Sequence, residues 1–103
     1  MSVALQIRDD KDAEERLVPV APEHVFKATW LHGATELGLE WVASMETGID
    51  VTEENLGEVV EELGRLRGWM NLRGETYDIE RLDRLVAELR ALRFDDGATA
   101  FVG

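Results

Sequence analysis

Hydrophobic and polar residues alternate at the start of the chain, as in a strand with one buried face. In residues 2–8, Val3, Leu5 and Ile7 fall on one side and polar or small residues on the other. Residues 9–16 are almost all charged and predict a solvated loop, and residues 17–21 then predict a second strand. Pro19 cannot donate a backbone N–H, so this strand is expected at an edge or a strand end. Together the two segments predict a hairpin.

Two patterns overlap in residues 22–36 and leave the choice between helix and strand open. Pro22 and Glu23 suit the first turn of a helix. The apolar residues after them recur at helical spacing but also alternate. Residues 37–45 alternate more regularly and are predicted to form the third strand, whose apolar side holds Leu37, Leu39, Trp41, Ala43 and Met45. A turn at residues 46–48 follows, in which Gly48 is able to take a positive φ.

Two amphipathic helices occupy most of the second half of the chain. Thr52 is the predicted N-cap of the first helix and Asp78 that of the second. The first helix has an apolar stripe at Leu56, Val59, Val60, Leu63, Leu66 and Met70. The stripe of the second helix comprises Ile79, Leu82, Leu85, Val86, Leu89 and Leu92.

A turn at residues 95–97 and a final strand at residues 98–102 complete the predicted order, β-β-α-β-α-α-β. This order predicts an α+β fold, with a small mixed or antiparallel sheet and about three helices packed on one face. The 103 residues fit one domain, spanning residues 1–103.

Three glycines on one flank of the first long helix raise a separate hypothesis. Gly57, Gly64 and Gly68 fall within about 40° of one another around the helix axis. Glycine inside a helix costs roughly 0.5–1 kcal/mol relative to alanine. The flank therefore either permits close approach by another element or partner, or its glycines are merely tolerated, and Gly68 is a candidate helix end. Trp69, at the border of the stripe, is a candidate interface anchor or a core residue.

Negative charge is concentrated in the first part of the chain. Residues 1–64 hold 15 acidic residues against 4 basic ones, whereas residues 65–103 hold seven of each, so that the net charge is −11. Between Lys27 and Arg65 no lysine or arginine occurs. Such a field repels phosphate backbones and anionic lipids, so direct binding to nucleic acid or to a membrane is not expected, and it attracts basic proteins.

The chain has no cysteine, which excludes disulfides, a thiolate nucleophile and cysteine-ligated zinc. It shows neither an N-terminal signal pattern nor a stretch of about 18 apolar residues, so a cytoplasmic location is expected. No catalytic, cofactor-binding or metal-binding motif appears. His24 and His32 are eight residues apart, too far along a helix to chelate one metal alone. Asp10, Asp12 and Glu14 begin like a calcium loop, but Glu15 and Ala21 stand where its glycine and closing glutamate belong.

These observations predict a small protein-protein interaction module that binds a basic protein through carboxylates. The predicted contact residues are Glu36, Glu40, Glu46, Asp50, Glu54, Glu58, Glu61 and Glu62. The composition is similar to that of bacterial inhibitors and immunity-type proteins, which neutralise basic partners, although no specific motif is shared. Two alternatives stay open: a homo-oligomeric structural domain, and a small enzyme or ligand-binding protein that uses carboxylates and a histidine. Solvation is the ordinary explanation of such a charged surface.

Overall fold

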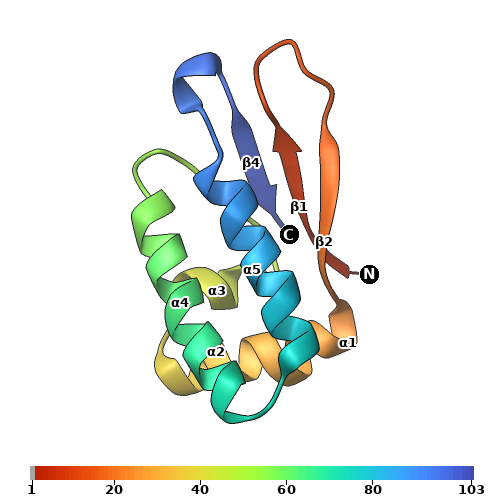
Figure 1. Ribbon diagram of the computed structural model, residues 1–103, viewed down its shortest axis with the longest axis vertical. Helices are drawn as coiled ribbons and strands as arrows, with labels where there is room; N and C mark the ends of the chain where they lie inside the picture. The colour runs from red at the N-terminus through yellow and green to blue at the C-terminus, as the bar shows by residue number, and fades with distance from the viewer. Residues whose placement is uncertain (1) are drawn as a thin grey trace.

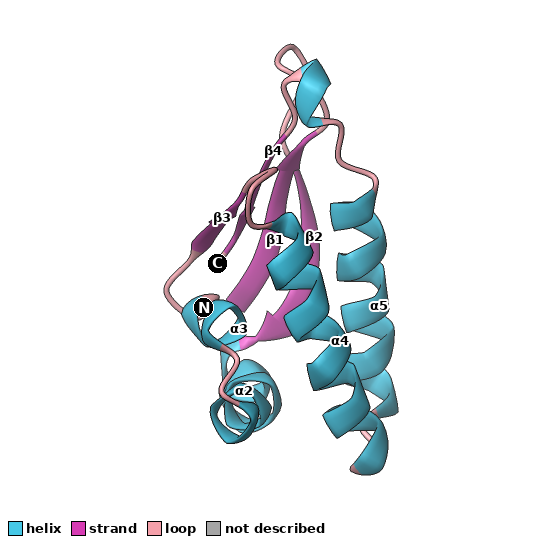
Figure 2. Ribbon diagram, turned by 90° about the vertical axis from the view of Figure 1, so that its left-hand side faces the viewer, coloured by secondary structure: helices cyan, strands magenta, loops and turns pink. Residues whose placement is uncertain are grey.

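Four antiparallel strands form one sheet in the order β2-β1-β4-β3 (Figure 2). The computed structural model describes residues 2–103. The strands are β1 (Ser2–Arg8), β2 (Arg16–Pro22), β3 (Ile49–Val51) and β4 (Thr99–Val102). The helical elements are α1 (Glu23–Val25), the π-helical segment η1 (Phe26–Leu31), α2 (His32–Leu37), α3 (Glu40–Ser44), α4 (Leu56–Leu72), α5 (Thr76–Arg90) and the 3-10 turn η2 (Phe94–Asp96). The predicted α+β class is confirmed, and the sheet is antiparallel.

One face of the sheet is covered and the other is open. Along β1, Val3, Leu5 and Ile7 are buried, as their alternation predicts, while the residues between them are partly exposed. The covered face packs against the helices, and the long helices α4 and α5 lie side by side (Figure 1). The predicted hairpin of β1 and β2 is confirmed, and Pro19 lies in β2, an edge strand. Edge strands tolerate proline because their outer N–H groups have no strand to pair with.

The prediction of a strand over residues 37–45 is wrong, because this segment ends α2 and forms α3. Its buried residues are Leu39, Val42 and Met45, three apart, which is the spacing of one helix face. Gly38 takes a left-handed conformation (φ 71°) and ends α2, so the chain turns before α3 begins. The third strand is instead Ile49–Val51, which takes the same place in the predicted order.

The open question over residues 22–36 is answered by a continuous helical run, α1, η1 and α2. Phe26 and Trp30 are buried on this run, and their rings stack with centroids 6.0 Å apart. The Trp30 indole Nε1 donates to Asp78 Oδ1 at 3.0 Å. Asp78 is buried in the first turn of α5, so its predicted role as N-cap is wrong. α5 begins two residues earlier, and the Asp78 carboxylate instead joins two helices through the core.

The helix α4 begins after a reciprocal pair of hydrogen bonds between Thr52 and Asn55. Thr52 Oγ1 accepts the N–H of Asn55 at 3.2 Å, and Asn55 Oδ1 accepts the N–H of Thr52 at 2.7 Å. The reciprocal bonds resemble a capping box, but the prediction of Thr52 as N-cap is wrong, because the N-cap of α4 is Asn55. Asn55 Nδ2 also donates to the carbonyl of Asp50 in β3 at 2.9 Å. Asn55 thereby satisfies backbone groups at the end of an edge strand that a further strand would otherwise bind.

Close helix packing depends on Gly33, not on the glycine flank of α4. A Cβ at Gly33 would lie 2.6 Å from Leu66 Cδ1 and 2.7 Å from Trp69 Cε3. At Gly57, Gly64 and Gly68, by contrast, a Cβ would meet no atom of the described residues within 4 Å beyond the local helix backbone. Within residues 2–103 no other element therefore makes a close approach to this flank. The interpretation of Gly68 as a helix end is wrong, since α4 continues to Leu72.

Candidate functional site

Two of the eight predicted contact residues, Glu58 and Glu62, form hydrogen bonds to the helix α3. Glu58 Oε2 accepts the indole N–H of Trp41 at 3.0 Å. Glu62 Oε1 accepts the backbone N–H of Val42 at 3.1 Å, and so satisfies an amide in the first turn of α3. These carboxylates lie on the side of α4 that faces α3. Helical periodicity placed both glutamates opposite the apolar stripe of α4, and it could not show that α3 packs against that side.

Glu36 belongs to a separate cluster at the contact between α2 and α4. It accepts the indole N–H of Trp69 at 2.5 Å and lies 3.5 Å from Nε2 of His32. The hydrogen bond from Trp69, aided by His32, lowers the pKa of the Glu36 carboxyl below its usual value. The guanidinium of Arg73 lies 4.6 Å from the centroid of the Trp69 ring. Trp69 is thus half-buried among its own neighbours.

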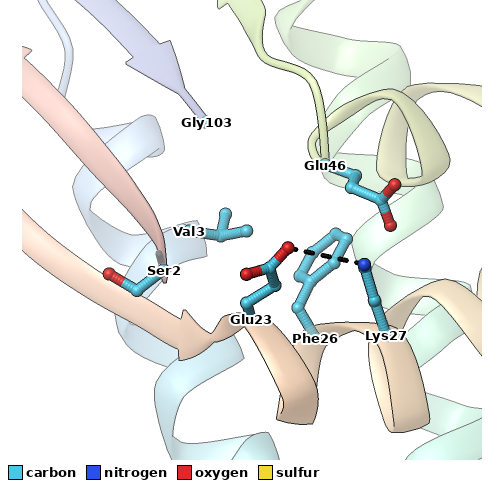
Figure 3. A pocket seen from close by; sticks show the side chains of 7 residues that line it. All are labelled: Ser2, Val3, Glu23, Phe26, Lys27, Glu46 and Gly103. Carbon is cyan, nitrogen blue, oxygen red and sulfur yellow. Dashed lines mark ion pairs between the residues drawn. The ribbon is translucent and has the colours of Figure 1, made fainter.

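Glu46 lies beside Lys27 at a small pocket between the start of β1 and the helical run (Figure 3). Lys27 Nζ is 3.4 Å from Glu23 Oε1, and this lysine lowers the pKa of Glu23. The pocket holds only about 70 Å³, small against the ~300–1,000 Å³ typical of ligand sites. Its lining comprises Ser2, Val3, Glu23, Phe26, Lys27, Glu46 and Gly103.

The remaining four predicted residues are Glu40, Asp50, Glu54 and Glu61. All four are exposed, and within residues 2–103 none of their carboxylates has a hydrogen-bond or ion-pair partner. They come from α3, β3, the turn before α4, and α4 itself. We call these four carboxylates, together with the two hollows described next, the acidic surface.

Two hollows border the first half of α4. The first, of about 300 Å³, is lined by Glu40, Trp41, Ser44 and Glu58. The second, of about 440 Å³, combines carboxylates with an apolar floor, and is lined by Asp50, Val51, Thr52, Glu53, Glu54, Phe94, Ala98, Thr99 and Ala100. Each hollow therefore places an aromatic ring beside carboxylates, which suits the aliphatic stem and charged head of a lysine or arginine.

Sequence reasoning missed the aromatic part of this surface. It counted Trp41 as one apolar residue of a strand, and it assigned no role to Phe94. The usable signal for Trp41 was the spacing of Leu39, Val42 and Met45, which puts Trp41 on the border of a helix face. No comparable signal exists for Phe94, because it reaches the hollow only through the pairing of β4 with β3.

The other side chains considered in the sequence were Asp10, Asp12 and the two histidines, as candidate metal ligands. Within residues 2–103, no group of three or more histidine, aspartate or glutamate side chains is arranged to hold a metal ion. Asp10 Oδ1 accepts the backbone N–H of Asp12 at 2.8 Å, which closes the turn between β1 and β2. His24 is exposed, and His32 contacts Glu36 and the Trp69 ring.

Comparison with protein-family models, with curated proteins and with solved structures found no match to this chain. None of the helices within residues 2–103 has both the length and the apolar character needed to cross a membrane.

Proposed function

We propose that this chain is a protein-protein interaction module, of an inhibitor or immunity type, that binds a basic protein through the acidic surface. The observation that carries the proposal is the set of exposed carboxylates of Glu40, Asp50, Glu54 and Glu61, which have no internal partner among the described residues. No lysine or arginine lies between Lys27 and Arg65 to neutralise them. Charges in this arrangement attract a cationic surface.

The physical advantage of such a surface is fast and selective encounter. Fixed charges of one sign raise association rates with an oppositely charged protein, and they repel anionic competitors. The two hollows give a basic side chain both a carboxylate and an aromatic wall. A carboxylate-rich surface can also occupy a partner's site for phosphate, which is how it would inhibit a nucleic-acid-binding or phosphate-binding protein. The absence of cysteine suits a reducing compartment, and we place this activity in the cytoplasm.

Glu58 and Glu62 have a different role in this proposal. Because they bind Trp41 and the α3 backbone, replacing them changes the shape of the surface as well as its charge. A test of binding must therefore leave both residues in place.

The decisive experiment compares two variants that each remove four negative charges. The first carries Glu40→Gln, Asp50→Asn, Glu54→Gln and Glu61→Gln. The matched control carries Glu14→Gln, Glu15→Gln, Glu80→Gln and Asp95→Asn, which are exposed and lie outside the acidic surface. Each is immobilised, and proteins of the encoding organism are captured at about 0.05 M and about 0.5 M salt, where screening differs strongly.

We expect the native chain and the control to retain a basic protein at low salt and to release it at high salt. The first variant should bind that protein about tenfold more weakly or worse. Equal loss in both variants would show that only net charge is at work, and retention by the first variant would remove the acidic surface from the explanation.

A further inference from the structure

A second surface lies at the opposite edge of the sheet from the acidic surface. A hollow of about 310 Å³ runs along β1, β2 and α5, and is lined by Ser2, Val3, Ala4, Leu17, Pro19, Ala21, Pro22 and Arg81. We call it the β2 groove. Its lining is mostly apolar, and among the described residues it includes no carboxylate. Figure 2 shows β2 and β3 at the two edges of the sheet, so the groove and the acidic surface are separate.

Arg81 is the only charged residue among the described residues that line the β2 groove, and its environment differs from that of the other arginines. It is half-buried, whereas the other eight arginines are exposed. Its guanidinium lies 4.9 Å from the centroid of the Tyr77 ring and donates to the Tyr77 hydroxyl. Within residues 2–103 it has no carboxylate partner, although the chain holds 22 acidic residues. A guanidinium has five N–H donors, so most of those of Arg81 remain available to a ligand.

Two exposed apolar side chains belong to this surface: Leu17 lines the groove, and Tyr77 contacts Arg81. Leu17 is 64% exposed and Tyr77 is 60% exposed, and both are among the exposed large apolar residues of the described chain. An apolar channel beside an uncompensated guanidinium matches an apolar group that carries an anion, since an arginine binds a carboxylate with two parallel hydrogen bonds.

We propose that the β2 groove binds a segment of a partner protein that carries a carboxylate next to an apolar side chain. The apolar side chain packs against Leu17 and Pro19, and the carboxylate binds Arg81. The segment does not extend the sheet as a regular further strand, because Pro19 and Pro22 supply no N–H at this edge. This inference goes beyond the proposed function, because it concerns a different surface and a partner segment that is acidic, whereas the acidic surface binds a basic protein.

A second copy of this chain fits the groove less well than a separate partner does. In a two-fold dimer the same surface faces itself, so the groove would meet another groove and bring Arg81 no carboxylate. The net charge of −11 on each copy also opposes their approach.

The test uses the whole chain, labelled with nitrogen-15, and follows its backbone amides by NMR. The probe is an acetylated and amidated pentapeptide of alternating leucine and glutamate, with two matched peptides in which glutamine or lysine replaces glutamate. The protein variants are Arg81→Gln, Leu17→Ser and the control Arg84→Gln, an exposed arginine on the same helix. Both groove positions have accessible side chains, so the amide spectra should show an unchanged fold.

We expect the glutamate peptide to produce saturable shifts along β2 and around Arg81. Binding should fall about tenfold for the glutamine peptide and for Arg81→Gln, fall for Leu17→Ser, and stay unchanged for Arg84→Gln. Equal binding of the three peptides, or the absence of shifts at the groove, would overturn the proposal. Sedimentation showing a dimer that Leu17→Ser dissociates would also overturn it, because the occupant would then be a second copy.

Discussion

Replacing Gly33 and Gly64 by alanine should change stability in opposite directions. Both glycines lie inside helices, where alanine is favoured by about 0.5–1 kcal/mol. At Gly64 the new methyl group meets no described atom within 4 Å beyond the local helix backbone, so Gly64→Ala should raise the free energy of unfolding by about that amount. At Gly33 the methyl group would lie 2.6 Å from Leu66 Cδ1 and 2.7 Å from Trp69 Cε3, well inside van der Waals contact.

Relief of that overlap requires α2 and α4 to separate, or Leu66 and Trp69 to move. Leu66 is fully buried, and the indole of Trp69 is held by Glu36 and Arg73. Overpacking of this kind costs about 1–3 kcal/mol, which exceeds the gain in helix propensity. Gly33→Ala should therefore destabilise the protein by about 1 kcal/mol or more.

Urea unfolding and thermal unfolding measure both variants. A change of 1 kcal/mol corresponds to roughly 4–8 °C in Tm for a domain of this size. Gly57→Ala is a second control near the start of α4, and it should resemble Gly64→Ala. If Gly33→Ala stabilises the protein as much as Gly64→Ala does, α2 and α4 are not packed as closely as this argument requires.

Three further changes test individual contacts within the fold. Trp30→Phe removes the donor to the buried Asp78 carboxylate and should lower the free energy of unfolding by about 2–3 kcal/mol; Asp78→Asn in the same background should recover part of that loss in urea unfolding. Asn55→Ala removes the capping contacts at the end of β3 and should cost about 1–2 kcal/mol in the same assay, whereas a neutral result would refute its role. The pKa of Glu36 is lowered because Trp69 donates to its carboxylate. The stabilising effect is therefore present above the unfolded pKa of Glu36 and is lost as pH falls through the folded pKa. The difference in Tm between the native chain and Glu36→Gln should therefore narrow from pH 6 to pH 3, and a constant difference would contradict this.

Helices were predictable from the sequence where the hydrophobic pattern extends over several turns. The 17 residues of α4 and the 15 of α5 span several turns, so their apolar stripes distinguish a helix from a strand. The three residues of β3 are too short to show a period, and its burial comes from pairing with β4, which lies far along the chain. In residues 37–45 the apolar residues fit both the strand period of two and the helix period of 3.6. The helix forms because it buries Leu39, Val42 and Met45 in the core.

The acidic surface was predictable only as a set of charges. The sequence showed a run of carboxylates without a nearby cation, but not which of them have an internal partner. That depends on α3, whose Trp41 indole and Val42 amide bind Glu58 and Glu62. It also depends on Trp69, which binds Glu36 across 33 residues of chain. The β2 groove was not predictable at all, because Arg81 and Leu17 come together only through the packing of α5 on β2.

The four carboxylates left without a partner carry an energetic cost that folding does not explain. Like charges on one surface repel one another, and residues 28–64 contain no lysine or arginine to compensate for them. Neutralising Glu40, Asp50, Glu54 and Glu61 as amides should therefore leave the protein equally stable or more stable. If the same variant also loses its basic partner, the chain keeps these charges for binding and at the expense of stability, as functional sites commonly do. If it gains stability and loses no binding, the acidic surface serves solvation alone.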